Sequence, residues 1–117
     1  MATIKSYTDL EQSKKLAEIL PLESADMYYW HGSYRLLRVN DGKCEDIDIP
    51  AWSLAALLNI LPDELEDSHY LTLDKEGKEY CCFYEDCNGN SFRHCFSDNP
   101  VDACVQMIIK LSELKKL

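Results

Sequence analysis

The most apolar stretch of the chain lies between two prolines, Pro50 and Pro62. Only Ser53 and Asn59 are polar inside it, and leucines recur at intervals of three and four residues, the spacing of one helix stripe. This pattern predicts a helix that begins near Pro50, where a missing N–H costs nothing, and ends before Pro62. A helix that is apolar on nearly all sides must be buried, so we expect it to be the most buried element of the chain. The alternative use for such a helix is the seam of a homodimer.

Capping signals and helical spacing of apolar residues predict two further helices. The first starts at Thr8, which forms a capping box with Glu11, and it stops at Pro21. The second starts at Asn99-Pro100, a polar cap followed by a proline suited to the first helical turn. The expected buried stripe of this last helix consists of Val101, Cys104, Val105, Ile108, Leu111 and Leu114.

Strand signals lie between the first two predicted helices. An aromatic run at residues 27–30 is followed by a turn at 31–33. Residues 34–39 are rich in strand formers and lead into Asn40-Asp41-Gly42, which is a hairpin-turn signal. Residues 43–49 are expected either to return as a strand or to lead into the central helix as an extended loop.

A second group of strands follows the central helix. Residues 63–68 form an acidic linker that we expect to be a solvated loop. Residues 69–74, 78–85 and 91–96 then predict three antiparallel strands joined by turns. The predicted fold is a single α+β domain over residues 1–117, with an antiparallel sheet built of two hairpin or meander units. Its helices pack mainly on one face, in the order α-β-β(-β)-α-β-β-β-α.

Residues 16–29 and 57–70 match each other at a constant offset of 41. The identities run from Leu16 and Leu57 to Tyr29 and Tyr70. Each segment contains a helix end, a stop proline, an acidic linker and the start of a strand. An internal αββ duplication explains the match and predicts two pseudo-symmetric halves. Chance recurrence of a common local pattern is the alternative.

Composition and charge exclude several classes of partner. The net charge is −9, with 21 acidic and 12 basic residues, and the hydrophobic content of 46% is that of an ordinary globular domain. Because Lys and Arg are not clustered, direct binding to nucleic acid or to an anionic membrane surface is not expected. No run approaches the length of about 18 apolar residues that a membrane span needs. The N-terminus lacks the apolar core of a secretory signal, so we expect a cytoplasmic protein.

Six cysteines raise the question of disulfides or of a metal site. In a reducing compartment free thiols are the default. Cys81, Cys82, Cys87 and Cys95 cluster, with His94 beside the last, but the paired spacing of a zinc site is missing. We therefore expect six reduced thiols without a metal or a cofactor. The strand cysteines should be buried as small hydrophobic residues.

The sequence contains no recognisable catalytic motif. The three histidines, His31, His69 and His94, stand in no nucleophile, phosphate-binding or metal-binding pattern. The sharpest enzyme hypothesis is a dyad of Cys82 or Cys95 with His69 or His94 in a pocket between helix and sheet. His94 and Cys95 cannot pair with each other, because adjacent strand residues point to opposite faces. We therefore expect a protein that is not an enzyme.

Aromatic residues are concentrated in the predicted strands, and half of them must face away from the helices if the strands alternate. An aromatic face rimmed by carboxylates has the composition of a recognition surface, and its charge favours a basic protein partner. Mimicry of nucleic acid toward a DNA-binding protein is a variant of this hypothesis. The alternative is that the aromatics only complete the core and a solvated sheet face. The chain itself is expected to be a monomer or a homodimer. The candidate surface residues are Tyr28, Trp30, Tyr34, Tyr80 and Tyr84.

Three segments carry a resemblance to a known group of proteins: SADM at residues 24–27, IPAWSLAALL at 49–58 and NPVDAC at 99–104. Through them the chain resembles a family of small uncharacterised proteins from gut anaerobes of the Bacteroides type, often encoded in phage-like or other mobile DNA. The resemblance extends over most of the chain and includes all three predicted helices. It implies an accessory protein inside the cell that acts on a host or phage component. It implies no activity, cofactor or site residue.

Overall fold

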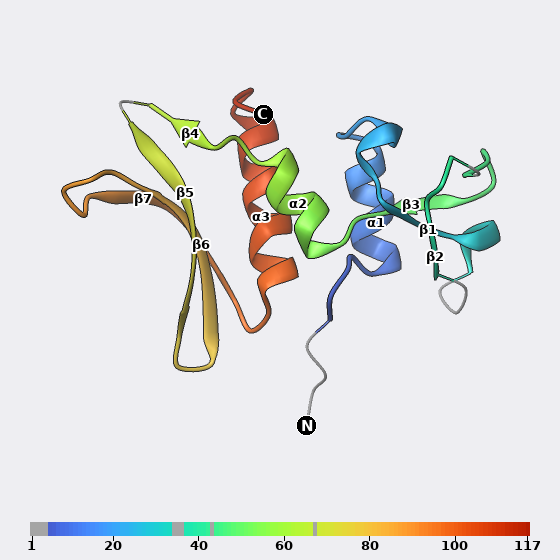
Figure 1. Cartoon of the computed structure of the whole chain (residues 1–117), viewed down its shortest axis with the longest axis horizontal. Coiled ribbons are helices and arrows are strands. Elements are labelled where there is room, and N and C mark those ends of the chain that lie inside the picture. The colour runs from blue at the N-terminus through green and yellow to red at the C-terminus, as the bar shows by residue number, and fades with distance from the viewer. Residues whose placement is uncertain (1–4, 34–36, 43, 67) are drawn as a thin grey trace.

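The structure is a computed structural model that describes residues 5–33, 37–42, 44–66 and 68–117. Two antiparallel sheets lie at opposite ends of the molecule with three helices between them (Figure 1). The helices are α1 (Leu10–Ala17), α2 (Leu54–Ile60) and α3 (Pro100–Glu113), with short 3-10 turns η1 (Leu22–Ser24) and η2 (Trp30–Gly32). The strands are β1 (Met27–Tyr29), β2 (Leu37–Val39), β3 (Ile49–Ala51), β4 (Glu64–Leu65), β5 (His69–Glu76), β6 (Glu79–Glu85) and β7 (Ser91–Ser97). The α+β class and the predicted order are confirmed, with the short β4 added.

The first sheet has the strand order β2-β1-β3, and both pairs are antiparallel. The segment after the Asn40 turn therefore returns beside β1 and not beside β2, since Tyr28 lies opposite both Arg38 and Pro50. Only its last residues are extended. Residues 44–48 form a loop, which was the second of the two structures predicted for this segment. The Asp48 carboxylate stabilises the loop by accepting hydrogen bonds from the backbone N–H groups of His31 (2.7 Å) and Glu45 (2.8 Å).

The second sheet has the order β4-β5-β6-β7, and β5, β6 and β7 form the predicted meander. The β5–β6 turn uses Gly77 with a φ of 64°, a left-handed conformation that glycine adopts without strain. The acidic linker is not the fully solvated loop that the sequence predicts. Leu65 turns into the core with 8% of its surface exposed, and the segment pairs with the start of β5 as β4.

The prediction that the central helix is the most buried element is wrong, because α3 takes that place. Eight residues of α3 are buried, whereas Leu57 is the only residue within the α2 bounds that reaches this level. The reason is position: α3 packs on β6 and β7 on one side and on α2 on the other. The predicted α3 stripe is correct except at Leu114, which follows the helix and is 46% exposed.

The start of α2 also differs from the prediction. Pro50 lies in β3, an edge strand, where a missing N–H leaves no ladder bond unmade. Ser53 is the N-cap of α2, and its Oγ accepts a hydrogen bond from the N–H of Ala56 at 3.2 Å. The end of α2 is as predicted: Leu61, before Pro62, is extended with a ψ of 135°.

The cap of α1 is Asp9, one residue after the predicted Thr8, and Gln12 completes the capping box. Thr8 is fully buried instead. Its hydroxyl lies 2.7 Å from the Ser13 hydroxyl and accepts a hydrogen bond from the Trp52 N–H at 3.1 Å. The Thr8 hydroxyl therefore bonds to Ser13 and Trp52 in the core and does not cap the helix in the way that the local pattern predicted.

The two halves of the chain share only part of their topology. The matched segments end in β1 and at the start of β5, and each of these strands is the antiparallel neighbour of the next one, β2 and β6. The third strand joins β1 in the first sheet, whereas it joins β6 in the second. The duplication therefore remains a prediction.

Candidate functional site

The β5–β6–β7 sheet has one face covered by α3 and one open face. In β6 the side chains of Cys82 and Tyr84 point toward α3 and are fully buried. Glu79, Cys81, Phe83 and Glu85 alternate with them and belong to the open face. On β5, Asp74 and Glu76 lie opposite Cys81 and Glu79 and belong to the same face.

A β-bulge in β7 decides which of its side chains reach the open face. Tyr84 pairs with Phe92 and Cys82 pairs with Cys95, so two residues of β7, Arg93 and His94, stand opposite Phe83. Arg93 has a φ of 59°, in the left-handed region where glycine is usual in such bulges. Because of the extra residue, Phe92 and Cys95 both point toward the core, while Ser91, His94 and Phe96 line the open face.

Side-chain contacts hold the bulge in place. The Arg93 guanidinium donates a hydrogen bond to Glu66 Oε1 at 2.7 Å and lies 4.9 Å from the centre of the Phe92 ring. Lys116 Nζ lies 2.5 Å from the same oxygen. These hydrogen bonds from Lys116 and Arg93 hold the pKa of Glu66 below its usual range. The turn before β5, the bulge in β7 and the end of the chain are thereby joined.

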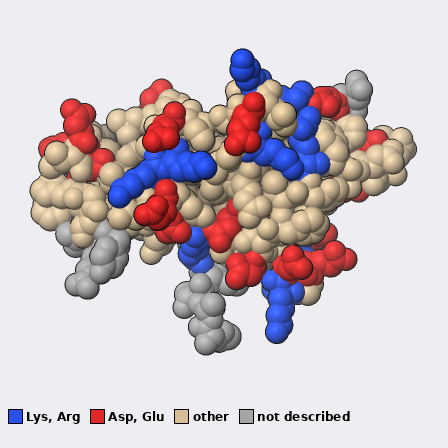
Figure 2. All heavy atoms as spheres, turned by 180° about the vertical axis from the view of Figure 1, so that it is seen from behind, with Lys and Arg blue, Asp and Glu red and all other residues tan. Residues whose placement is uncertain are grey.

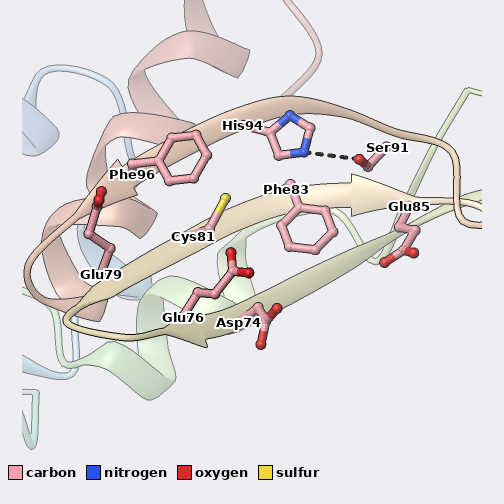
Figure 3. Close-up of a pocket in the computed structure, with 9 residues that line it drawn as sticks. All are labelled: Asp74, Glu76, Glu79, Cys81, Phe83, Glu85, Ser91, His94 and Phe96. Atoms are coloured by element: carbon pink, nitrogen blue, oxygen red, sulfur yellow. Dashed lines mark hydrogen bonds between the residues drawn. The ribbon is translucent and has the colours of Figure 1, made fainter.

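The open face carries a hollow of about 510 Å³, which we call the acidic hollow. Its lining residues are Asp74, Glu76, Glu79, Cys81, Phe83, Glu85, Ser91, His94 and Phe96 (Figure 3). Phe83, His94 and Phe96 form what we call the ring platform. The His94 ring centre lies 5.2 Å from that of Phe83 and 5.9 Å from that of Phe96, with interplanar angles of 21° and 11°. Figure 3 shows the three rings side by side with their faces turned outward.

The charges around the ring platform have a single sign. Four carboxylates line the hollow, from Asp74, Glu76, Glu79 and Glu85, and its lining contains no lysine or arginine. On the face shown in Figure 2, by contrast, basic side chains lie among the acidic ones. The hollow is thus a local concentration of negative charge around open aromatic faces. This arrangement suits a cation, which ring faces and carboxylates both attract.

Cys81 and His94 both line the acidic hollow, but they make separate contacts. Burial raises the pKa of the Cys81 thiol, and the carboxylates of Asp74 and Glu76 act in the same direction. His94 shares a hydrogen bond of 2.9 Å with the Ser91 hydroxyl, and no described thiol is hydrogen-bonded to a histidine. A raised pKa leaves little thiolate, which is the nucleophilic form of cysteine.

Two members of the predicted dyads, Cys82 and His69, also make separate contacts. Cys82 is fully buried, and a hydrogen bond with Cys104 together with burial raises its pKa. His69 Nδ1 lies 2.6 Å from the Glu66 carbonyl oxygen, and its ring meets the edge of Phe92. As predicted, the cysteines of β6 and β7 are buried, and His94 and Cys95 point to opposite faces. All six cysteines are free thiols, of which Cys87 is exposed.

The predicted surface residues are not the ones that form the site. Tyr28 and Tyr84 are buried at 5% and 0% exposure, so neither belongs to an exposed face. Tyr84 shares a face with Cys82 because strand residues two apart point the same way. Tyr80 is half-buried on that face, with Lys75 Nζ 5.5 Å from its ring centre. Trp30 belongs to the other end of the molecule, stacked on His31 and covered by the guanidinium of Arg38 at 4.6 Å. Tyr34 lies outside the described residues.

The site residues that the sequence reasoning missed are Phe83, His94 and Phe96. For Phe83 a signal was present, because Glu79 and Glu85 mark its face of β6 as the wet one. For His94 and Phe96 the bulge at Arg93 hides the pattern. Uninterrupted alternation from Phe92, which packs partly buried against the core, would place both of them on the core face.

Comparisons with protein-family models, with curated proteins and with solved structures gave no match for this chain. Within the described residues, no helix has the length and apolar character needed to cross a membrane. No group of three or more His, Cys, Asp or Glu side chains in that part of the chain is arranged to hold a metal ion. The interpretation of the site therefore rests on its own geometry.

Proposed function

We propose that the chain is a non-enzymatic protein-binding module, in which the acidic hollow takes cationic side chains of a basic partner. The observation that carries this proposal is the ring platform, three outward-facing rings within a border of four carboxylates. A cation over an exposed aromatic face gains about 0.5–1 kcal/mol, and carboxylates within reach add attraction and steer its approach. A setting in phage-like or mobile DNA, which the sequence resemblance implies, belongs to the same proposal.

A polypeptide fits this surface better than nucleic acid does. Phosphate groups would meet the carboxylates of Asp74, Glu76, Glu79 and Glu85, and like charges repel. Lysine and arginine side chains meet complementary charge, and the guanidinium group also stacks on aromatic rings. The ligand class is therefore a segment of protein rich in lysine or arginine.

A labelled arginine-rich peptide and its glutamine analogue test the proposal by fluorescence anisotropy. The arginine peptide should bind and the glutamine peptide should not. Affinity should fall as salt rises from about 0.02 M to about 0.5 M, because the screening length shortens severalfold over that range.

Two matched double variants separate the hollow from the overall charge. Glu76→Gln with Glu79→Gln removes two carboxylates of the hollow, and Glu18→Gln with Glu23→Gln removes two exposed carboxylates outside it. Only the first pair should weaken the arginine peptide strongly. Equal losses in both double variants would show that net charge, and not this site, attracts the peptide. Absence of binding at low salt would refute the proposed function.

A further inference from the structure

The strand β7 forms one edge of its sheet. It has seven residues, whereas the opposite edge strand, β4, has two. The carbonyl of Phe96 accepts a hydrogen bond from the Gln106 side chain at 3.2 Å, so it points away from β6. Phe96 and Cys81 are thus a non-hydrogen-bonded pair, and the N–H of Phe96 also faces the free edge. An edge of this kind is a template for a further strand.

Two concave surfaces meet along this edge. The acidic hollow lies on the open face. A second concavity of about 330 Å³, the helix-side groove, is lined by His94, Cys95, Gln106, Ile109, Lys110 and Glu113, between β7 and α3. His94 borders both. A strand laid along β7 would send alternate side chains into the two concavities, because successive strand residues point to opposite faces.

We infer that the basic partner binds as an extended segment that adds to the sheet at β7, an inference that rests on the proposed function. Its cationic side chains enter the acidic hollow at every second position. The intervening side chains are apolar, because they face Cys95 and Ile109 in the helix-side groove. Charge selects this occupant over a second copy of the chain, since pairing two β7 edges would bring two acidic hollows together. Backbone hydrogen bonds then give affinity, and the alternating pattern gives specificity.

Three peptides with the same numbers of arginine and valine residues test the inference. One alternates arginine with valine, one carries the arginines and valines in two blocks, and one is the alternating peptide with N-methyl groups on the amides that would pair with β7. The alternating peptide should bind at least tenfold more tightly than the other two. On binding, exchange of the Phe96 amide hydrogen should slow in NMR spectra. Gln106→Ala, which removes the side chain that occupies the Phe96 carbonyl, should bind the alternating peptide more tightly and leave the block peptide unchanged.

The outcomes separate the two proposals. Equal binding of all three peptides, weakened by Glu76→Gln with Glu79→Gln, would overturn strand addition and leave the proposed function standing. No binding of any peptide at low salt would refute the proposed function itself. Protection of the Phe96 amide that rises with protein concentration, together with a dimer mass in light scattering, would identify a second copy as the occupant and overturn the inference.

Discussion

Removal of a single ring from the ring platform gives the sharpest test of how the site works. Phe96 is 53% exposed and borders the acidic hollow, so its ring face is available to a ligand. Phe96→Leu keeps an apolar side chain on β7 and removes the aromatic face. If the ring contributes the usual 0.5–1 kcal/mol of an exposed cation–π contact, affinity for an arginine peptide should fall about two- to fivefold. Adding Phe83→Leu should extend the loss to about five- to thirtyfold.

The matched control is Tyr70→Leu. Tyr70 is 49% exposed and pairs with Glu85, so it lies on the same face of the sheet, but it does not line the hollow. This change should alter affinity less than twofold. Isothermal titration calorimetry measures the affinities, and urea unfolding confirms that each variant is folded under the titration conditions. The reasoning fails if Phe96→Leu binds as tightly as the unaltered chain, or if Tyr70→Leu loses as much.

Three further predictions concern stability. Leu57→Ala should lower the free energy of unfolding by about 2–5 kcal/mol, because the side chain is fully buried. Leu58→Ala, at a half-buried position, should lower it by about half as much. Urea unfolding compares the two variants, and equal losses would contradict the burial argument. Tyr84→Phe should lower the free energy of unfolding by about 1 kcal/mol in the same assay, since the Pro62 carbonyl loses the hydrogen bond of 2.7 Å from the phenol. A change near zero would show that water replaces this hydrogen bond. Backbone hydrogen bonds from Glu45 and His31 lower the pKa of Asp48. Its contribution to the free energy of unfolding is therefore present above the unfolded carboxyl pKa of about 3.9 and is lost as the pH falls below that value. Asp48→Asn should lower the melting temperature at pH 7, and the variant should lose less stability on acidification than the unaltered chain.

Local signals predicted the elements whose ends are set by local hydrogen bonds. The start of α3 is the clearest case, because the Asn99 side chain accepts from the Asp102 N–H at 2.9 Å as its type and position indicate. The same reasoning failed at Thr8, whose hydroxyl bonds to Ser13 and Trp52 in the core. It also failed at Pro50, since a proline suits an edge strand as well as a first helical turn. In both cases a partner distant in sequence decided between two locally acceptable structures.

The presence of an exposed aromatic sheet face was predicted better than the residues that form it. An exposed sheet face with aromatic rings and carboxylates follows from alternation and net charge, and the structure contains such a face. The prediction that Tyr84 is exposed was wrong, because Tyr84 shares the core face with Cys82 and donates its hydroxyl hydrogen bond to a backbone carbonyl. A buried tyrosine with a bonded hydroxyl and an exposed one look the same in the sequence.

The left-handed backbone conformation of Arg93, in the β7 bulge, determines which side chains form the ring platform. A non-glycine residue in the left-handed region costs of order 1–3 kcal/mol and persists only where its surroundings hold it, and here Glu66 and Lys116 provide that support. The same residue shifts the register of β7, so that Phe92 and Cys95 remain in the core while His94 and Phe96 reach the open face. Without the bulge, one stretch of β7 could bury its core residues or present its rings, but not both, since a slip of one residue exchanges the two faces. The strained conformation at Arg93 is therefore what allows a single strand to close the core and to build the ring platform.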